Sequence, residues 1–169
     1  MPSFPPFLAR SIDVTPLWLV ERVARTIFSG VLRAHPDLFE RLGDYRQTRY
    51  GFAPVDLPLH FAVVPATQSL IVSRRGQSQP VDARIEGPLV LLLGLLEGRC
   101  DADALFFSRD LAVTGDMEAM LALRNALDDS TIDLPREIGA LAGPFSPLVA
   151  GTARYIRARA LEGRDVTWN

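Results

Sequence analysis

The sequence predicts an α+β protein in which about five strands form a mostly antiparallel sheet covered by helices. Three observations favour this class. Short runs rich in β-branched and aromatic residues alternate with turn residues between positions 59 and 86. A strand–turn–strand–helix unit follows at 105–127. Helical patterns flank this region on both sides, so the predicted core carries helical N- and C-terminal extensions.

An amphipathic helix is the first predicted element. Thr15 is a good N-cap, and Pro16 suits the first helical position. Apolar residues then recur at intervals of three and four, and they form one stripe of Leu17, Val20, Ala24, Ile27, Phe28 and Val31. The helix ends at His35-Pro36 because the residue before a proline avoids the helical region, and a short helix at 36–42 follows. We assign residues 1–50 to this N-terminal helical extension.

Three strands are predicted next. Residues 59–64 and 70–73 are β-rich and are joined by a turn-like link. Residues 81–86 alternate strictly, with apolar side chains at every second position. That period is typical of a half-buried antiparallel strand.

The most apolar part of the chain, residues 88–97, predicts a helix that ends at Gly98. Its apolar run is far shorter than the roughly 20 residues that a membrane-spanning helix needs. A helix without a polar face is either buried in a core or has one side turned to an apolar ligand. The residues alone leave both interpretations open, and the same choice applies to Phe106, Met117 and Met120.

The segment 105–127 predicts two further strands and a helix. The strands lie at 105–107 and 111–114, separated by a polar turn. Gly115 ends the second strand, and Asp116 is placed to cap the helix after it. Residues 51–134 are thus predicted to form the core, and residues 135–169 a Pro/Gly-rich loop followed by a C-terminal helix.

The run Leu-Phe-Phe-Ser-Arg-Asp-Leu at 105–111, with Gly115-Asp116 after it, resembles the sterol carrier protein type-2 family. Where that family often has Gly and Lys, this chain has Ser108 and Arg109, which is similar to a bacterial branch of ubiquinone-biosynthesis accessory factors. The resemblance implies a sheet and helices that enclose an apolar tunnel. It also implies a non-catalytic, oxygen-independent role in carrying isoprenoid quinone intermediates or phospholipid. The implied partners are enzymes of that pathway, including oxygen-independent hydroxylases.

The expected tunnel lining consists of apolar side chains from the predicted strands and helices. The candidate lipid-binding residues are Phe61, Val63, Val72, Ile85, Leu89, Leu92, Leu93, Leu96, Phe106, Leu111, Val113, Met117, Met120 and Leu121.

Other function classes lack their sequence signals. His35 and His60 have no neighbouring ligand at metal spacing, so no metal or other cofactor is expected. No nucleophile elbow and no phosphate-binding loop occur, and the acids around Asp101 and Asp103 have ordinary turn and capping roles, so an enzyme is not predicted. The single Cys100 excludes a disulfide framework. Residues 51–135 are net acidic, which disfavours nucleic acid as a partner.

The two terminal stretches are net basic and could meet an anionic membrane. Trp18 on the first helix and Arg154, Arg157 and Arg159 on the last are the candidate membrane contacts. We expect a cytoplasmic protein that is either free or peripheral to the inner membrane. The sequence leaves open whether it forms a homodimer. Two alternatives to a lipid carrier remain: an interaction module whose apolar groove binds a partner helix, and a small enzyme of unknown type.

Overall fold

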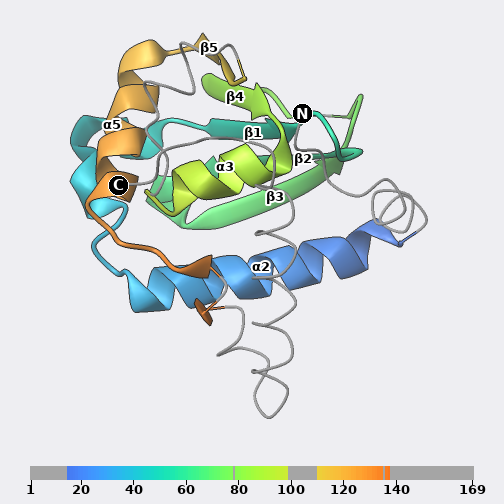
Figure 1. Cartoon of the computed structure of the whole chain (residues 1–169), viewed down its shortest axis with the longest axis horizontal. Coiled ribbons are helices and arrows are strands. Elements are labelled where there is room, and N and C mark those ends of the chain that lie inside the picture. Colours follow the sequence, from blue (N-terminus) through green and yellow to red (C-terminus); the bar gives the residue numbers. More distant parts are fainter. Residues whose placement is uncertain (1–14, 78, 99–109, 135, 138–169) are drawn as a thin grey trace, which may run out of the picture.

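A five-stranded sheet in the order β3-β2-β1-β4-β5 forms the centre of the computed structural model (Figure 1). The structure describes residues 15–77, 79–98, 110–134 and 136–137. The strands are β1 (Tyr50–Pro54), β2 (Leu59–Val64), β3 (Ser69–Arg74), β4 (Ala83–Gly87) and β5 (Ala112–Gly115). The pairs β1–β2, β2–β3 and β4–β5 are antiparallel, and β1–β4 is parallel. The predicted α+β class with a mostly antiparallel sheet is confirmed.

The set of five strands differs from the predicted one. Strand β1, at the middle of the sheet, was not predicted, because Gly51 and Pro54 are residues that strands usually avoid. Its Gly51 is required by packing, since a side chain there would run into Val81. The predicted strand at 105–107 lies outside the described residues.

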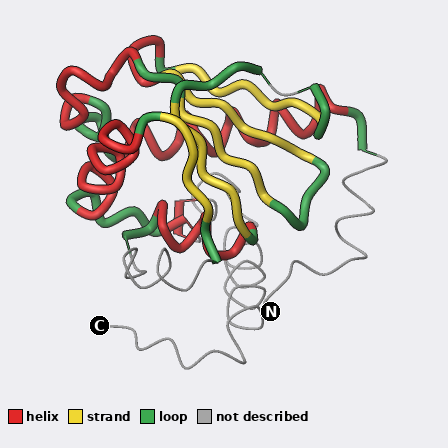
Figure 2. The backbone as a smooth tube through the Cα atoms, turned by 90° about the horizontal axis from the view of Figure 1, so that it is seen from above, coloured by secondary structure: helices red, strands yellow, loops and turns green. Residues whose placement is uncertain are grey.

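One face of the sheet carries the apolar side chains. Register pairs Val72 with Phe61, Phe61 with Phe52, Phe52 with Ile85, and Ile85 with Val113, so these side chains lie in one row across the sheet. The helices pack against this face, because the row and its neighbours share hydrophobic clusters with helical residues. Seen from above, the strands form one twisted layer (Figure 2).

Helix α2 (Leu17–Ala34) lies along β3 (Figure 1). Its predicted stripe packs on the sheet: Leu17, Val20, Ala24 and Phe28 pack against the buried Leu59, Leu70 and Val72. The stripe is therefore used within the fold.

The helix predicted at 36–42 is wrong in type and extent. Residues 36–39 form turns, and a 3₁₀ helix, η1 (Glu40–Gln47), follows. Gly43 kinks η1 with a positive φ of 53° that a side chain would disfavour. The segment is held by its apolar residues: Leu38, Phe39 and Leu42 are buried in the core. A second, short 3₁₀ turn, η2 (Pro65–Thr67), links β2 to β3.

Two further helices in the described part of the chain belong to the helical layer. Helix α3 (Leu89–Leu96) confirms the predicted apolar helix, and Asp56 caps its start by accepting a hydrogen bond from the Leu89 amide at 2.9 Å. Helix α5 (Met117–Asp128) packs against α3, η1 and β4. The predicted C-terminal helix lies outside the described residues.

Candidate functional site

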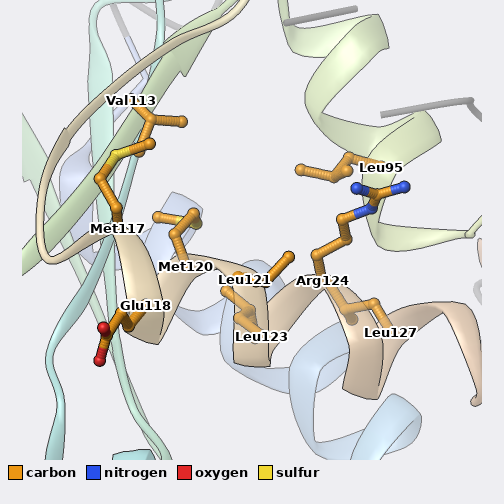
Figure 3. A pocket seen from close by; sticks show the side chains of 9 residues that line it. All are labelled: Leu95, Val113, Met117, Glu118, Met120, Leu121, Leu123, Arg124 and Leu127. Atoms are coloured by element: carbon orange, nitrogen blue, oxygen red, sulfur yellow. The ribbon is translucent and has the colours of Figure 1, made fainter. Parts of the chain in front are cut away.

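An apolar cavity of about 310 Å³ lies between α5, the end of α3 and strand β5 (Figure 3). Nine of the described residues line it: Leu95, Val113, Met117, Glu118, Met120, Leu121, Leu123, Arg124 and Leu127. Seven of these side chains are apolar, a composition that is typical of pockets that bind apolar ligands.

The Gly115-Asp116 pair starts the helix that forms one wall. Gly115 has a φ of 86°, and a side chain at this position would collide with the carbonyl of Asp82. The chain turns there into α5, and the Asp116 carboxylate accepts a hydrogen bond from the Ala119 amide at 2.9 Å. The predicted roles of both residues, strand end and helix cap, are confirmed.

Helical spacing then decides which α5 residues meet the cavity. Met117, Met120, Leu121 and Arg124 follow each other at intervals of three, one and three, so they share one side of the helix. Met120 is 5% exposed and Met117 is 61% exposed. The cavity therefore has a buried floor and an exposed apolar rim.

Two tyrosines fix α5 against the rest of the fold. The fully buried Tyr50 hydroxyl lies 3.3 Å from the carbonyl oxygens of Ala119 and Tyr45. Burial raises the pKa of Tyr50 to about 12. The Tyr45 hydroxyl donates to the Glu118 carboxylate at 2.9 Å, and this hydrogen bond raises the pKa of Tyr45. Glu118 is thus engaged by η1, although part of its side chain borders the cavity.

A family model described as the SCP-2 sterol transfer family matches residues 28–128. The chain belongs to this family. The match includes every strand of the sheet and both helices that line the cavity. The family resemblance stated from the motif at 105–116 is confirmed.

Solved structures agree with that assignment. A protein named "UbiJ-SCP2 Ubiquinone synthesis protein" is 17% identical, with a TM-score of 0.55 over 70% of this chain and 98% of that one. Sterol carrier protein 2 from Yarrowia lipolytica, in its apo form, is 16% identical, with a TM-score of 0.46 over 63% of this chain and 91% of that one. The first of these likenesses shows that the two proteins share the SCP-2 fold. A search of curated protein sequences finds no match.

The structure brings four of the predicted lining residues together at the cavity of this SCP-2 domain: Val113, Met117, Met120 and Leu121. The other predicted residues that the structure describes lie elsewhere. Val72, Ile85, Leu92 and Leu111 are buried in the hydrophobic clusters. Phe61 and Val63 pack beside α2, while Leu89 and Leu96 are half-buried on α3. Leu93 is 37% exposed, and Phe106 lies outside the described residues.

Five lining residues were not predicted. Leu95, Leu123 and Leu127 are apolar helix residues whose spacing alone does not distinguish a lining position from a core position. Glu118 and Arg124 were passed over because charged side chains are normally solvated. Their spacing from Leu121, three residues on either side, was the available signal.

The candidate membrane residues are only partly within the described chain. Trp18 is 64% exposed on α2, whereas Arg154, Arg157 and Arg159 lie outside the described residues. No described helix combines the length and apolar character needed to cross a membrane. Among the described residues, no group of three His, Cys, Asp or Glu side chains is arranged to hold a metal ion.

Proposed function

We propose that this SCP-2 domain is a non-catalytic lipid carrier that holds one apolar chain in the cavity between α5, α3 and β5. The observation that carries the proposal is the lining itself: seven of its nine described side chains are apolar, and Met117 and Leu121 at the rim are exposed. A lipid tail can pass this exposed apolar rim and reach the buried residues at the bottom of the cavity. The described cavity holds no arrangement of nucleophile and base that would suggest chemistry instead.

Energetics favour a chain-like ligand. Burying one methylene contributes about 0.8 kcal/mol, so one five-carbon isoprene unit contributes about 3–4 kcal/mol before ordering costs. The cavity, at about 310 Å³, is near the lower end of the volumes typical of ligand pockets, about 300–1,000 Å³. We infer that it encloses part of a tail, while the remainder lies along the exposed rim of Met117 and Leu121.

We assign the cargo to ubiquinone biosynthesis. Two facts support this choice. The motif at 105–111 resembles the accessory factor UbiT, and a structural neighbour is named as a ubiquinone synthesis protein. The proposed cargo is a prenylated quinone precursor, or a phospholipid acyl chain in its place. The proposed partners are the ring-modifying enzymes of the pathway, including oxygen-independent hydroxylases.

A partner helix is the second candidate occupant. The exposed fractions of Met117 (61%) and Leu121 (54%) would equally suit the apolar face of an amphipathic helix. In that case the protein would be an interaction module without a lipid.

Organic extraction of the purified protein, followed by mass spectrometry, tests the proposal. We expect a prenylphenol, a quinone or a phospholipid in the extract, and a native mass spectrum that gains one ligand mass after exposure to prenylphenol. Protein that carries no lipid and stays bare after exposure would contradict the carrier role and favour the partner helix.

We also propose that the carrier works in the cytoplasm and touches the inner membrane through the outer side of α2. Trp18, Leu19 and Val23 are exposed there, and the exposed Arg22 lies among them by helical spacing. An apolar patch with an aromatic anchor and a cation is typical of an interfacial helix.

A further inference from the structure

Two methionines, Met117 and Met120, line the apolar cavity from the same helix, α5. Their exposure to solvent differs: Met117 is 61% exposed at the rim, whereas Met120 is 5% exposed on the floor. In Figure 3 the Met117 side chain extends toward Val113, so its thioether lies at the β5 end of the cavity. The described lining therefore contains one thioether that small solutes reach from the solvent and one that the fold shields.

An exposed thioether is open to oxidation by peroxides. The sulfur attacks one oxygen of hydrogen peroxide, the O–O bond breaks, and the products are a sulfoxide and one molecule of water. The sulfur is oxidised in this step and the peroxide is reduced. The reaction converts a flexible apolar side chain into a polar one whose oxygen accepts hydrogen bonds. At Met117 this change would place a polar group on the rim of the cavity.

The position of Met117 separates an effect on the ligand from an effect on the fold. In the empty cavity a sulfoxide at the exposed rim stays hydrated, so the fold loses little stability. A lipid tail that lies along Met117 and Leu121 would strip water from the sulfoxide, and burying a polar group without a hydrogen-bond partner is unfavourable. Among the described lining side chains, Arg124 is the one with N–H donors, and in Figure 3 it lies at the other end of the cavity, near Leu95.

We propose that Met117 is a site of reversible oxidation, at which hydrogen peroxide weakens the binding of the lipid tail. The inference rests on the proposed lipid-carrier function and adds regulation of the same cavity to it. The sulfoxide at Met117 lowers the affinity for the tail, while Met120 on the floor remains a thioether. A methionine sulfoxide reductase reverses the change: the oxygen leaves as water, and a dithiol that serves as reductant is oxidised to a disulfide.

Prenylphenol uptake before and after mild treatment with hydrogen peroxide tests the proposal, and peptide mass spectrometry locates the added oxygen. We expect one oxygen on Met117 and none on Met120. Uptake should become about tenfold weaker once Met117 is oxidised, since the tail then has to desolvate the sulfoxide. The urea midpoint of the lipid-free protein should stay the same, and enzymatic reduction of the sulfoxide should restore uptake.

The variants Met117→Leu and Met120→Leu form a matched pair, because each replaces one thioether of α5 by an apolar side chain of similar volume. Each variant is compared with itself, with and without peroxide. Met117→Leu should show no loss on treatment, whereas Met120→Leu should lose uptake as the wild type does. Met1 and Cys100 are present in both variants, so their oxidation cannot produce this difference.

The remaining outcomes separate this inference from the carrier function. Uptake that is undiminished after oxidation of Met117, or a Met117 that peroxide leaves unmodified, would overturn the inference while the carrier function stands. A loss that persists in Met117→Leu, that reduction does not reverse, or that accompanies a lower urea midpoint would also overturn it, because another residue, irreversible damage or unfolding would then be the cause. Failure to take up prenylphenol before any peroxide is added would overturn the carrier function, and the inference with it.

Discussion

Tyr50 shows how a single residue holds the cavity wall in place. It starts the central strand β1, is fully buried, and its hydroxyl reaches the backbone of both η1 and α5. Removing that hydroxyl takes a hydrogen-bond donor from the buried carbonyl of Ala119 and the half-buried carbonyl of Tyr45, so we expect Tyr50→Phe to lower the free energy of unfolding by about 1–2 kcal/mol. Urea titration would measure the loss. An unchanged midpoint would show that these long hydrogen bonds contribute nothing.

The raised pKa of Tyr50 also predicts that the protein loses stability at alkaline pH. Burial raises the pKa of Tyr50 from 10.0 to about 12, so the folded state disfavours the phenolate. The resulting stabilisation is complete below pH 10 and is lost as the pH rises toward 12. Wild-type stability measured across this range should fall more steeply than that of Tyr50→Phe. Parallel curves would contradict the burial argument.

The lowered pKa of His60 predicts that the protein also loses stability at acidic pH. It lies on β2, and burial, followed by the charges of Arg84 and Arg75, lowers its pKa below 6.5. The neutral form is therefore favoured by folding, and stability should be complete above pH 6.5 and decline as the pH falls. In His60→Asn this decline should be smaller. Urea titrations of both proteins at successively lower pH would measure the difference, and equal declines would contradict the burial argument.

At the scale of elements, helix α2 has two apolar sides with different roles. The stripe predicted from spacing packs on β3, while Trp18, Leu19 and Val23 remain exposed on the outer side. We expect weak binding to anionic liposomes, about 1 kcal/mol per cation near the surface, that declines with salt. The double variant Trp18→Ser/Arg22→Ser should bind less in a flotation assay.

Val55→Ser is the control for this experiment. Val55 is 54% exposed, close to the exposure of Val23, but it lies in the turn between β1 and β2. Equal flotation of all variants, or equal binding to neutral vesicles, would remove α2 from the membrane contact. The contribution of Arg154, Arg157 and Arg159 stays a prediction.

Local signals predicted the elements that depend on local physics. The alternation of apolar and polar residues at 81–86 predicted β4 to within two residues of its observed start, and the Gly115-Asp116 pair predicted the start of α5. Strand β1 was not predicted, because its Gly51 and its parallel pairing with β4 depend on contacts with residues distant in the sequence, such as Val81. The kink at Gly43 was not predicted for a similar reason, since the burial of Leu38, Phe39 and Leu42 in the core determines the course of this segment.

The sequence predicted an apolar cavity, but only some of the residues that line it. Apolar spacing of three and four, together with the family resemblance, pointed to Met117, Met120 and Leu121, and these residues line the cavity on α5. Spacing could not distinguish a core position such as Leu92 from a lining position such as Leu95, because both are apolar residues of one helix. That difference depends on how α3 and α5 pack together, which is a property of the tertiary structure.

For the domain as a whole, we propose that the cavity of α5, α3 and β5 binds a lipid tail. The decisive experiment follows prenylphenol uptake by the variant Leu121→Glu with native mass spectrometry. Leu121 and Val55 are both 54% exposed, so Leu121→Glu and Val55→Glu should leave the fold equally intact. We predict that Leu121→Glu loses uptake at least tenfold, since a carboxylate beside the tail must be desolvated, and that Val55→Glu binds as the wild type does. Undiminished uptake by Leu121→Glu would contradict the claim.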